Sequence, residues 1–161
     1  MALVFSTAAG NDIPMSEDKI RGMRNFTNKL WNIGRFIVDF APEGAKHLDP
    51  KSVPSLIIQD DKDIVERLKE VEKSVTKALD SFRLHDAATT LYEFIWHEFA
   101  DKYIESTKER RAEAQPTLEY VFRTSLELLH PFMPYITEEL WQKLPHLGES
   151  IMVTKYPASH D

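Results

Sequence analysis

The chain has 161 residues, of which 42% are hydrophobic and 29% charged, a composition typical of a globular protein large enough to bury a core. No apolar run approaches the roughly 18 residues of a membrane-spanning helix, so no membrane contact is predicted. The absence of cysteine excludes disulfides and thiolate metal sites and is compatible with a reducing cytoplasm, whereas the net charge of −6, taken alone, argues against a nucleic-acid partner.

The first predicted element is a long helix from Ser16 to about Phe40. Ser16 is a suitable N-cap and is followed by two acids, which the helix dipole favours in a first turn. Residues 1–9 have the pattern of the end of an earlier helix, and GNDIP at 10–14 separates the two. The face expected to be buried contains Ile20, Met23, Thr27, Leu30, Gly34 and Ile37. The glycine in this face predicts that a neighbouring helix approaches closely.

Two further helices are predicted after a proline-containing loop at 41–60. The second helix covers about 62–81, and its expected core face contains Ile64, Leu68, Val71, Val75 and Leu79. The third covers about 84–111 and has two apolar stripes, which are Leu84, Ala88, Leu91 and Ile95, and Tyr92, Trp96, Phe99 and Tyr103. Because a helix that is apolar on two sides packs on two sides, we expect the third helix to be central and the most buried.

The C-terminal part predicts a fourth helix over about 116–129 and a corner at Pro131 and Pro134. Pro134 can open a short fifth helix that runs through Leu144. The fold is therefore expected to be all-α, an antiparallel helical bundle of four long helices plus a short fifth. The expected divisions are the end of a preceding helix and a linker at 1–15, the bundle at 16–144, and a tail at 145–161 that is a short strand or an arm. The aromatic residues assigned to the core are Trp96, Phe99, Tyr103, Phe132 and Trp141.

The sequence predicts no catalytic residue and no metal site. Neither a glycine-rich phosphate loop nor a G-x-S-x-G motif occurs. HEFAD at 97–101 lacks the second histidine of a zinc-protease helix, since Asp101 stands in its place. Glu93, His97 and Asp101 do share a helix face, which favours an ion pair with a neighbouring helix.

The first helix has an unusual charge pattern. Residues 19–35 contain Lys19, Arg21, Arg24, Lys29 and Arg35 and no acid, in a chain that is acidic overall. A basic stripe on an acidic body can bind a polyanion at one place and repel it elsewhere. The charge distribution therefore reopens the possibility of a nucleic-acid partner that the net charge alone disfavours.

Three asparagines share this face, although asparagine is a mediocre helix former. On a helical wheel Arg21, Asn25, Asn28, Asn32 and Arg35 follow steps of four and three, and Arg24, Lys29 and Trp31 flank them. Arginine and asparagine side chains hydrogen-bond phosphates and base edges, so the pattern favours RNA binding over a plain solvated face or a protein partner. We assign Trp31 to the core, and we expect base stacking from Phe40 and the following loop through His47.

A family resemblance is carried by several blocks of sequence. RNFTNKLWNIGRF at 24–36 resembles the RNFANKLWNA-RF signature of the helical anticodon-binding domain of valyl-tRNA synthetases. The similarity extends to GNDIPMSEDKI at 10–20, LHDAATTLYEFIWHEFADKYIE at 84–105 and LLHPFMPYITEELWQKLP at 128–145. The related isoleucyl, leucyl and methionyl enzymes share the bundle but are less similar in the first block. A free-standing helical protein-interaction module remains the alternative from another class.

The resemblance implies a part of a larger enzyme that positions valine tRNA for ATP-dependent aminoacylation by a catalytic domain absent from this chain. No cofactor is expected here, since ATP would bind the parent enzyme. The expected partners are the tRNA anticodon stem-loop and the parent's catalytic domain, in a cytoplasmic monomer. Predicted tRNA-binding residues are Arg21, Arg24, Asn25, Asn28, Lys29, Asn32, Arg35, Phe40 and His47. His97 and Lys102 replace the family's usual Asn and Trp, and we expect both to lie away from the basic stripe.

Overall fold

The computed structural model describes residues 17–39, 43, 49, 52–55 and 58–157. Its elements are α2 (Glu17–Val38), α3 (Gln59–Asp80), α4 (Leu84–Glu93), the π-helix η1 (Phe94–Ile104), the 3-10 helix η2 (Lys108–Arg110), α5 (Arg111–Leu129), α6 (Pro134–Trp141) and the 3-10 helix η3 (Ile151–Val153). The described residues contain no strand, and the all-α prediction is confirmed. The predicted helix end at 1–9, the N-cap Ser16 and most of the 41–60 loop lie outside the described residues.

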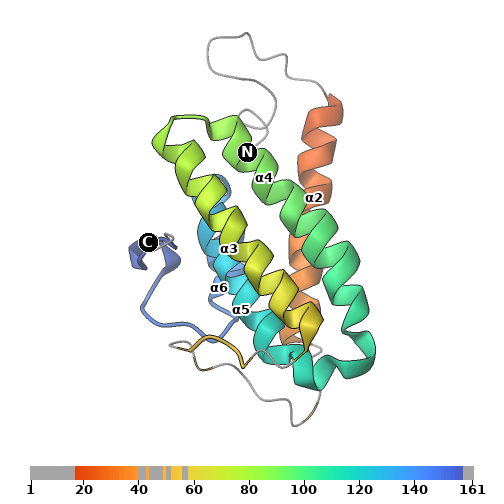
Figure 1. Cartoon of the computed structure of the whole chain (residues 1–161). Coiled ribbons are helices and arrows are strands. Elements are labelled where there is room, and N and C mark those ends of the chain that lie inside the picture. The colour runs from red at the N-terminus through yellow and green to blue at the C-terminus, as the bar shows by residue number, and fades with distance from the viewer. Residues whose placement is uncertain (1–16, 40–42, 44–48, 50–51, 56–57, 158–161) are drawn as a thin grey trace.

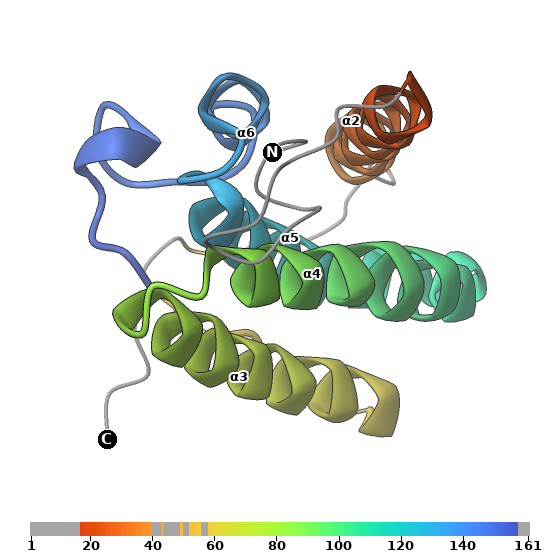
Figure 2. The same ribbon diagram turned by 90° about the horizontal axis from the view of Figure 1, so that it is seen from above.

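The helices form two layers on either side of α5. In Figure 1, α3 and α4 run antiparallel beside each other, joined by a short turn. Figure 2 shows α2 and α6 nearly end-on, on the opposite side of α5 from α3. Helix α5 contacts α2, α3, α4 and α6, which places it at the centre of the bundle.

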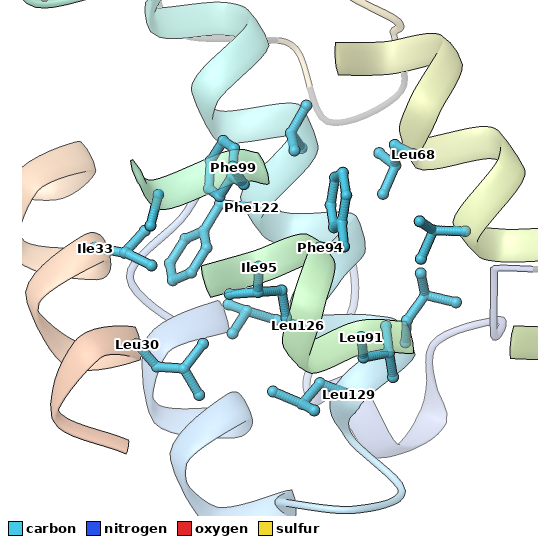
Figure 3. Packing of buried hydrophobic residues seen from close by; sticks show 14 of the residues in the cluster. Leu30, Ile33, Leu68, Leu91, Phe94, Ile95, Phe99, Phe122, Leu126 and Leu129 are labelled. Carbon is cyan, nitrogen blue, oxygen red and sulfur yellow. The ribbon is translucent and has the colours of Figure 1, made fainter. Parts of the chain in front are cut away.

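The prediction that the third helix is the most buried is wrong, because α5 takes that position. Thirteen of the nineteen residues of α5 are buried. They include Gln115, Glu119 and Arg123, whose polarity hides the helix from a hydropathy pattern. Figure 3 shows how Phe122 and Leu126 of this helix meet side chains from the neighbouring elements. Four of the five predicted core aromatics are buried (Phe99, Tyr103, Phe132 and Trp141), whereas Trp96 is half-buried against the core.

The third predicted helix changes its period in the middle. From Phe94 to Ile104 it is a π-helix, in which the hydrogen bonds span five residues. The buried side chains accordingly recur at intervals of five, with Phe94, Phe99 and Ile104 on one line and Ile95 and Ala100 on the next. The α-helical stripes predicted from the sequence therefore describe only its first half, and Leu84 at its start is 46% exposed.

The third helix also ends earlier than predicted, before 111. The hydroxyl of Ser106 donates to the Tyr103 carbonyl at 3.0 Å, and that of Thr107 donates to the Ile104 carbonyl at 2.9 Å. Such local bonds compete with the helical ladder. After them, Arg110 reaches the buried carboxylate of Asp61 at 2.7 Å. Helix α5 then begins at Arg111 and not at Pro116, so this proline lies inside its second turn.

Helix α2 buries a face that is rotated from the predicted one. Leu30 and Ile37 are buried as expected, but Phe26 and Ile33 complete the face and Ile20 is 52% exposed. Helix α3 fits better, since Ile64, Leu68, Val71 and Val75 are all buried and Leu79 is partly buried against the core. Helix α6 opens at Pro134 as predicted but ends at Trp141, three residues early.

The close approach predicted at Gly34 is confirmed. A Cβ atom at this position would lie 2.5 Å from Leu140 Cδ2 and 3.5 Å from Phe122 Cε1. Helices α5 and α6 can therefore pack against α2 at a distance that no larger residue would allow without local movement.

We predict opposite results for one substitution made at the two glycines of α2. A Cβ at Gly22 meets nothing within 4 Å, so Gly22→Ala should stabilise the chain by up to about 1 kcal/mol through helix propensity. Gly34→Ala should lose that gain, since overpacking a core costs about 1–3 kcal/mol. Urea unfolding of both variants measures the difference, and equal stabilisation would show that Leu140 yields freely.

Candidate nucleic-acid interface

The outward face of α2 presents the predicted RNA-binding residues together. Six of the nine candidates are exposed on it: Arg21, Arg24, Asn25, Asn28, Asn32 and Arg35. Among the described residues, no hydrogen bond or ion pair involves the side chains of Arg24, Asn25, Asn28 or Asn32. These groups have no structural task in the bundle, and their donors and acceptors are available to a ligand.

Acids at the two ends of α2 partly balance its charge. The Arg21 guanidinium lies 3.8 Å from Asp18, and that of Arg35 lies 3.5 Å from Asp39. Both pairs are at least half exposed, and such pairs are worth only about 0–1 kcal/mol. A phosphate could therefore compete for either arginine.

The end of α2 is fixed by side chains from the buried helix α5. Arg111 donates to the Phe36 carbonyl and its guanidinium stacks 3.9 Å over the Phe36 ring. The Gln115 amide donates to the Ile37 carbonyl at 2.9 Å and to Glu119 at 2.9 Å. The last carbonyls of a helix have no partner within it, so these bonds act as its C-terminal cap. No sequence pattern predicts this cap, because its partners are 75 and 78 residues apart.

Lys29 lies on the flank of α2 that faces the third helix. Its ammonium donates to Asp101 Oδ1 at 2.7 Å and stands 5.5 Å from the centre of the Trp96 ring. The ion pair predicted for the Glu93–Asp101 face is thus confirmed, with Lys29 as the partner. An RNA contact by Lys29 stays a prediction, and it would require the ammonium to share or leave this carboxylate.

The expectation that His97 lies away from the basic stripe is wrong. Its imidazole is 3.5 Å from Asp101 and 3.6 Å from Glu93. Since Asp101 also binds Lys29 of α2, the carboxylate of Asp101 connects His97 to the basic stripe. The hydrogen bond from Lys29 holds the pKa of Asp101 below its usual range, and His97 adds to this effect.

The assignment of Trp31 to the core is also wrong. The indole is 38% exposed, and the ammonium of Lys143, in the turn after α6, lies 5.9 Å from the ring centre. The helical wheel indicates this exposure, because Trp31 is three residues after Asn28 and four before Arg35 and so lies on their face of the helix. Phe40 and His47 lie outside the described residues, so base stacking by them stays a prediction.

The described part of the chain lacks the features of two other kinds of site, a metal centre and a membrane span. It contains no group of three histidine, aspartate or glutamate residues that could hold a metal ion. None of its helices combines the length and apolar character needed to cross a bilayer. A hollow of about 460 Å³ lies between α3 and the π-helix, and its lining mixes Asp60, Arg67, Glu98 and Lys102.

Comparison with known proteins gave concordant results. The sequence model of the family described as anticodon-binding domain of tRNA ligase matches residues 61–161. The valine–tRNA ligase of Carboxydothermus hydrogenoformans is 43% identical over 96% of this chain, and that of Aquifex aeolicus is 38% identical over 99%. The chain spans only 18% and 15% of these two relatives.

A solved structure supports the fold. The LeuRS of Agrobacterium radiobacter K84, in a ternary complex with tRNA and LeuAMS, matches 98% of this chain with a TM-score of 0.76. The identity is 17%, and this chain covers 18% of that one. At this identity the match shows a shared fold.

We predict that the Lys29–Asp101 pair makes the stability of the chain depend on pH in the acidic range. Because the folded-state pKa of Asp101 is lowered, its contribution is present above the unfolded value of about 3.9 and is lost as the pH falls through the folded one. Thermal melts from pH 7 to pH 2.5 should therefore fall less steeply for Asp101→Asn. Glu66→Gln is the control, since Glu66 is exposed and makes no ion pair with a described residue. Identical profiles for both variants would contradict the role of the pair.

Proposed function

The chain belongs to the anticodon-binding domains of tRNA ligases, and on this premise we propose that it binds the anticodon stem-loop of valine tRNA for a valine–tRNA ligase. The observation that carries the proposal is the outward face of α2, where arginines and asparagines are exposed together and where the side chains of Arg24, Asn25, Asn28 and Asn32 have no partner among the described residues. The choice of valine rests on relatives that are 38–44% identical over almost the whole chain.

In this proposal the chain contributes binding and positioning, and the chemistry lies elsewhere in the parent protein. The aligned segment is only 18% and 15% of the two named relatives, which leaves room in them for a catalytic domain that binds ATP and valine. Residues 16–144 would be the anticodon-binding bundle, with a linker at 1–15 and a tail at 145–161. Within the described tail, residues 151–153 form a 3-10 turn and not a strand. We further propose a cytoplasmic monomer.

The proposal explains why the α2 face is rich in asparagine. Each of these positions gives up roughly half a kcal/mol of helix propensity relative to alanine. An amide can donate to and accept from a base edge, which a lysine–glutamate surface cannot do at one site. The arginines add forks that bind phosphate or stack on a base plane.

We predict that Arg24→Ala weakens binding of a valine anticodon stem-loop RNA by about 1–3 kcal/mol if a base edge is read, and reduces the salt dependence if a phosphate is bound. Binding of the unaltered chain should be weak and should decline steeply with salt. Lys73→Ala is the matched control, because it removes one exposed cation from α3, on the other side of α5. Salt-insensitive capture of a protein ligand, without RNA binding, would favour the interaction-module alternative.

Asn28→Ala provides a sharper test, because its two effects have opposite signs. Alanine should raise the melting temperature slightly through helix propensity and should weaken RNA binding. Differential scanning calorimetry and a fluorescence titration measure both effects. Unchanged binding, or a clearly lower melting temperature, would mean that the asparagine is structural.

We also predict that this chain alone does not catalyse valine-dependent exchange between pyrophosphate and ATP. The sequence lacks a phosphate loop and the family's His-x-Gly-His and Lys-Met-Ser-Lys-Ser motifs. Measurable exchange by the purified chain would contradict the division of labour proposed here.

A further inference from the structure

Two large apolar side chains are exposed on α2, and they lie on the same flank. Ile20 is 52% exposed and Trp31 is 38% exposed. They are eleven residues apart, which is three helical turns to within about 20°. Arg24 lies between these two residues in the sequence, and its side chain has no partner among the described residues. The flank therefore combines an aromatic surface with an available guanidinium.

A cation from the turn after α6 lies beside the Trp31 ring. The Lys143 ammonium lies 5.9 Å from the centre of the Trp31 ring and 3.2 Å from Glu139, its neighbour one turn earlier on α6. The Lys143 side chain is 42% exposed and that of Glu139 is 58% exposed. An exposed ion pair of this kind is weak, so the ammonium can exchange Glu139 for a phosphate at little cost.

We propose that Trp31 and Lys143 extend the RNA-binding surface from α2 onto the turn after α6, with an unpaired nucleobase stacked on the indole and an adjacent phosphate bound by Lys143. This inference rests on the proposed function and adds two residues to it, one on α2 and one in the turn after α6. Exposed aromatic side chains beside arginine and lysine are the groups that bind the unpaired bases and the phosphates of single-stranded loops. A solitary surface tryptophan needs no such explanation. Here, however, the indole is in line with Asn28 and Arg35, the outer residues of the same face.

The two residues should have different signatures. Stacking is largely independent of ionic strength, so Trp31→Ala should lower affinity about tenfold or more without changing the salt slope, and Trp31→Phe should restore part of it. Lys143→Ala should reduce the slope of log affinity against log salt concentration by about one. Tyr135→Ala is the control for loss of an exposed aromatic, since Tyr135 on α6 is 91% exposed.

The experiment is a titration of the 161-residue chain and these variants with a synthetic valine anticodon stem-loop. A second RNA has the same stem and abasic sites in the loop. We expect Trp31→Ala to remove the preference for the RNA that has its loop bases, and circular dichroism melts to remain close to those of the unaltered chain. The RNA that has its loop bases should quench the tryptophan fluorescence of the unaltered chain. Most of this quenching should be lost in Trp31→Phe.

The outcomes separate this inference from the function on which it rests. If Arg24→Ala weakens binding while Trp31→Ala and Lys143→Ala do not, the inference is overturned and the proposed function stands. If neither the unaltered chain nor any variant binds the RNA, the proposed function and this inference are both overturned. If Trp31→Ala instead abolishes binding of a protein fraction and leaves RNA binding intact, the flank is a protein-docking surface and the inference is again overturned.

Discussion

The orientation of α2 depends on the cap that α5 places on its C-terminus. The Phe36 and Ile37 carbonyls would otherwise be left unsatisfied at the edge of the core, where a missing hydrogen bond costs about 1–3 kcal/mol. Arg111 and Gln115 satisfy them from a helix that is itself buried on nearly all sides. The result is a long helix whose end is fixed in register with the centre of the bundle. A displayed face can recognise a ligand only if its backbone is held in this way.

The other contacts of α2 divide its circumference among separate tasks. Phe26 and Leu30 supply the buried face, and Gly34 admits Leu140 on one flank. On the other flank Lys29 binds Asp101 and covers Trp96, which itself stacks with Tyr92 at 5.4 Å. Since cohesion is provided by these three sides, the fourth can consist of arginines and asparagines that contribute nothing to packing. This separation is why substitutions on the outer face should affect binding more than stability.

The sequence predicted the helices and the basic face well, and it failed where long-range contacts override local patterns. The 3.6-residue period could not reveal a π-helix, although the paired apolar residues at 94–95, 99–100 and 103–104 are the trace it leaves. The central position of α5 was not predicted, because its buried polar residues depress its hydropathy. Their partners, such as the Ile37 carbonyl for Gln115 and the Pro145 carbonyl for Arg123, come from distant segments. The candidate surface was easier to predict, since acid-free charge is a local property of one helix.

Trp31 shows how strongly the partner helix decides the role of a residue. From sequence its size favours the core, because a fully exposed indole wastes a large hydrophobic surface. In the folded chain the indole is only 38% exposed and the turn after α6 supplies a cation beside the ring, so the cost of exposure is reduced without fully burying the side chain. A half-covered indole with fixed orientation is a better stacking surface than a mobile one, since less side-chain freedom remains to be lost on binding. The close packing of α6 against α2 at Gly34, through Leu140, holds α6 next to the helix that carries Trp31.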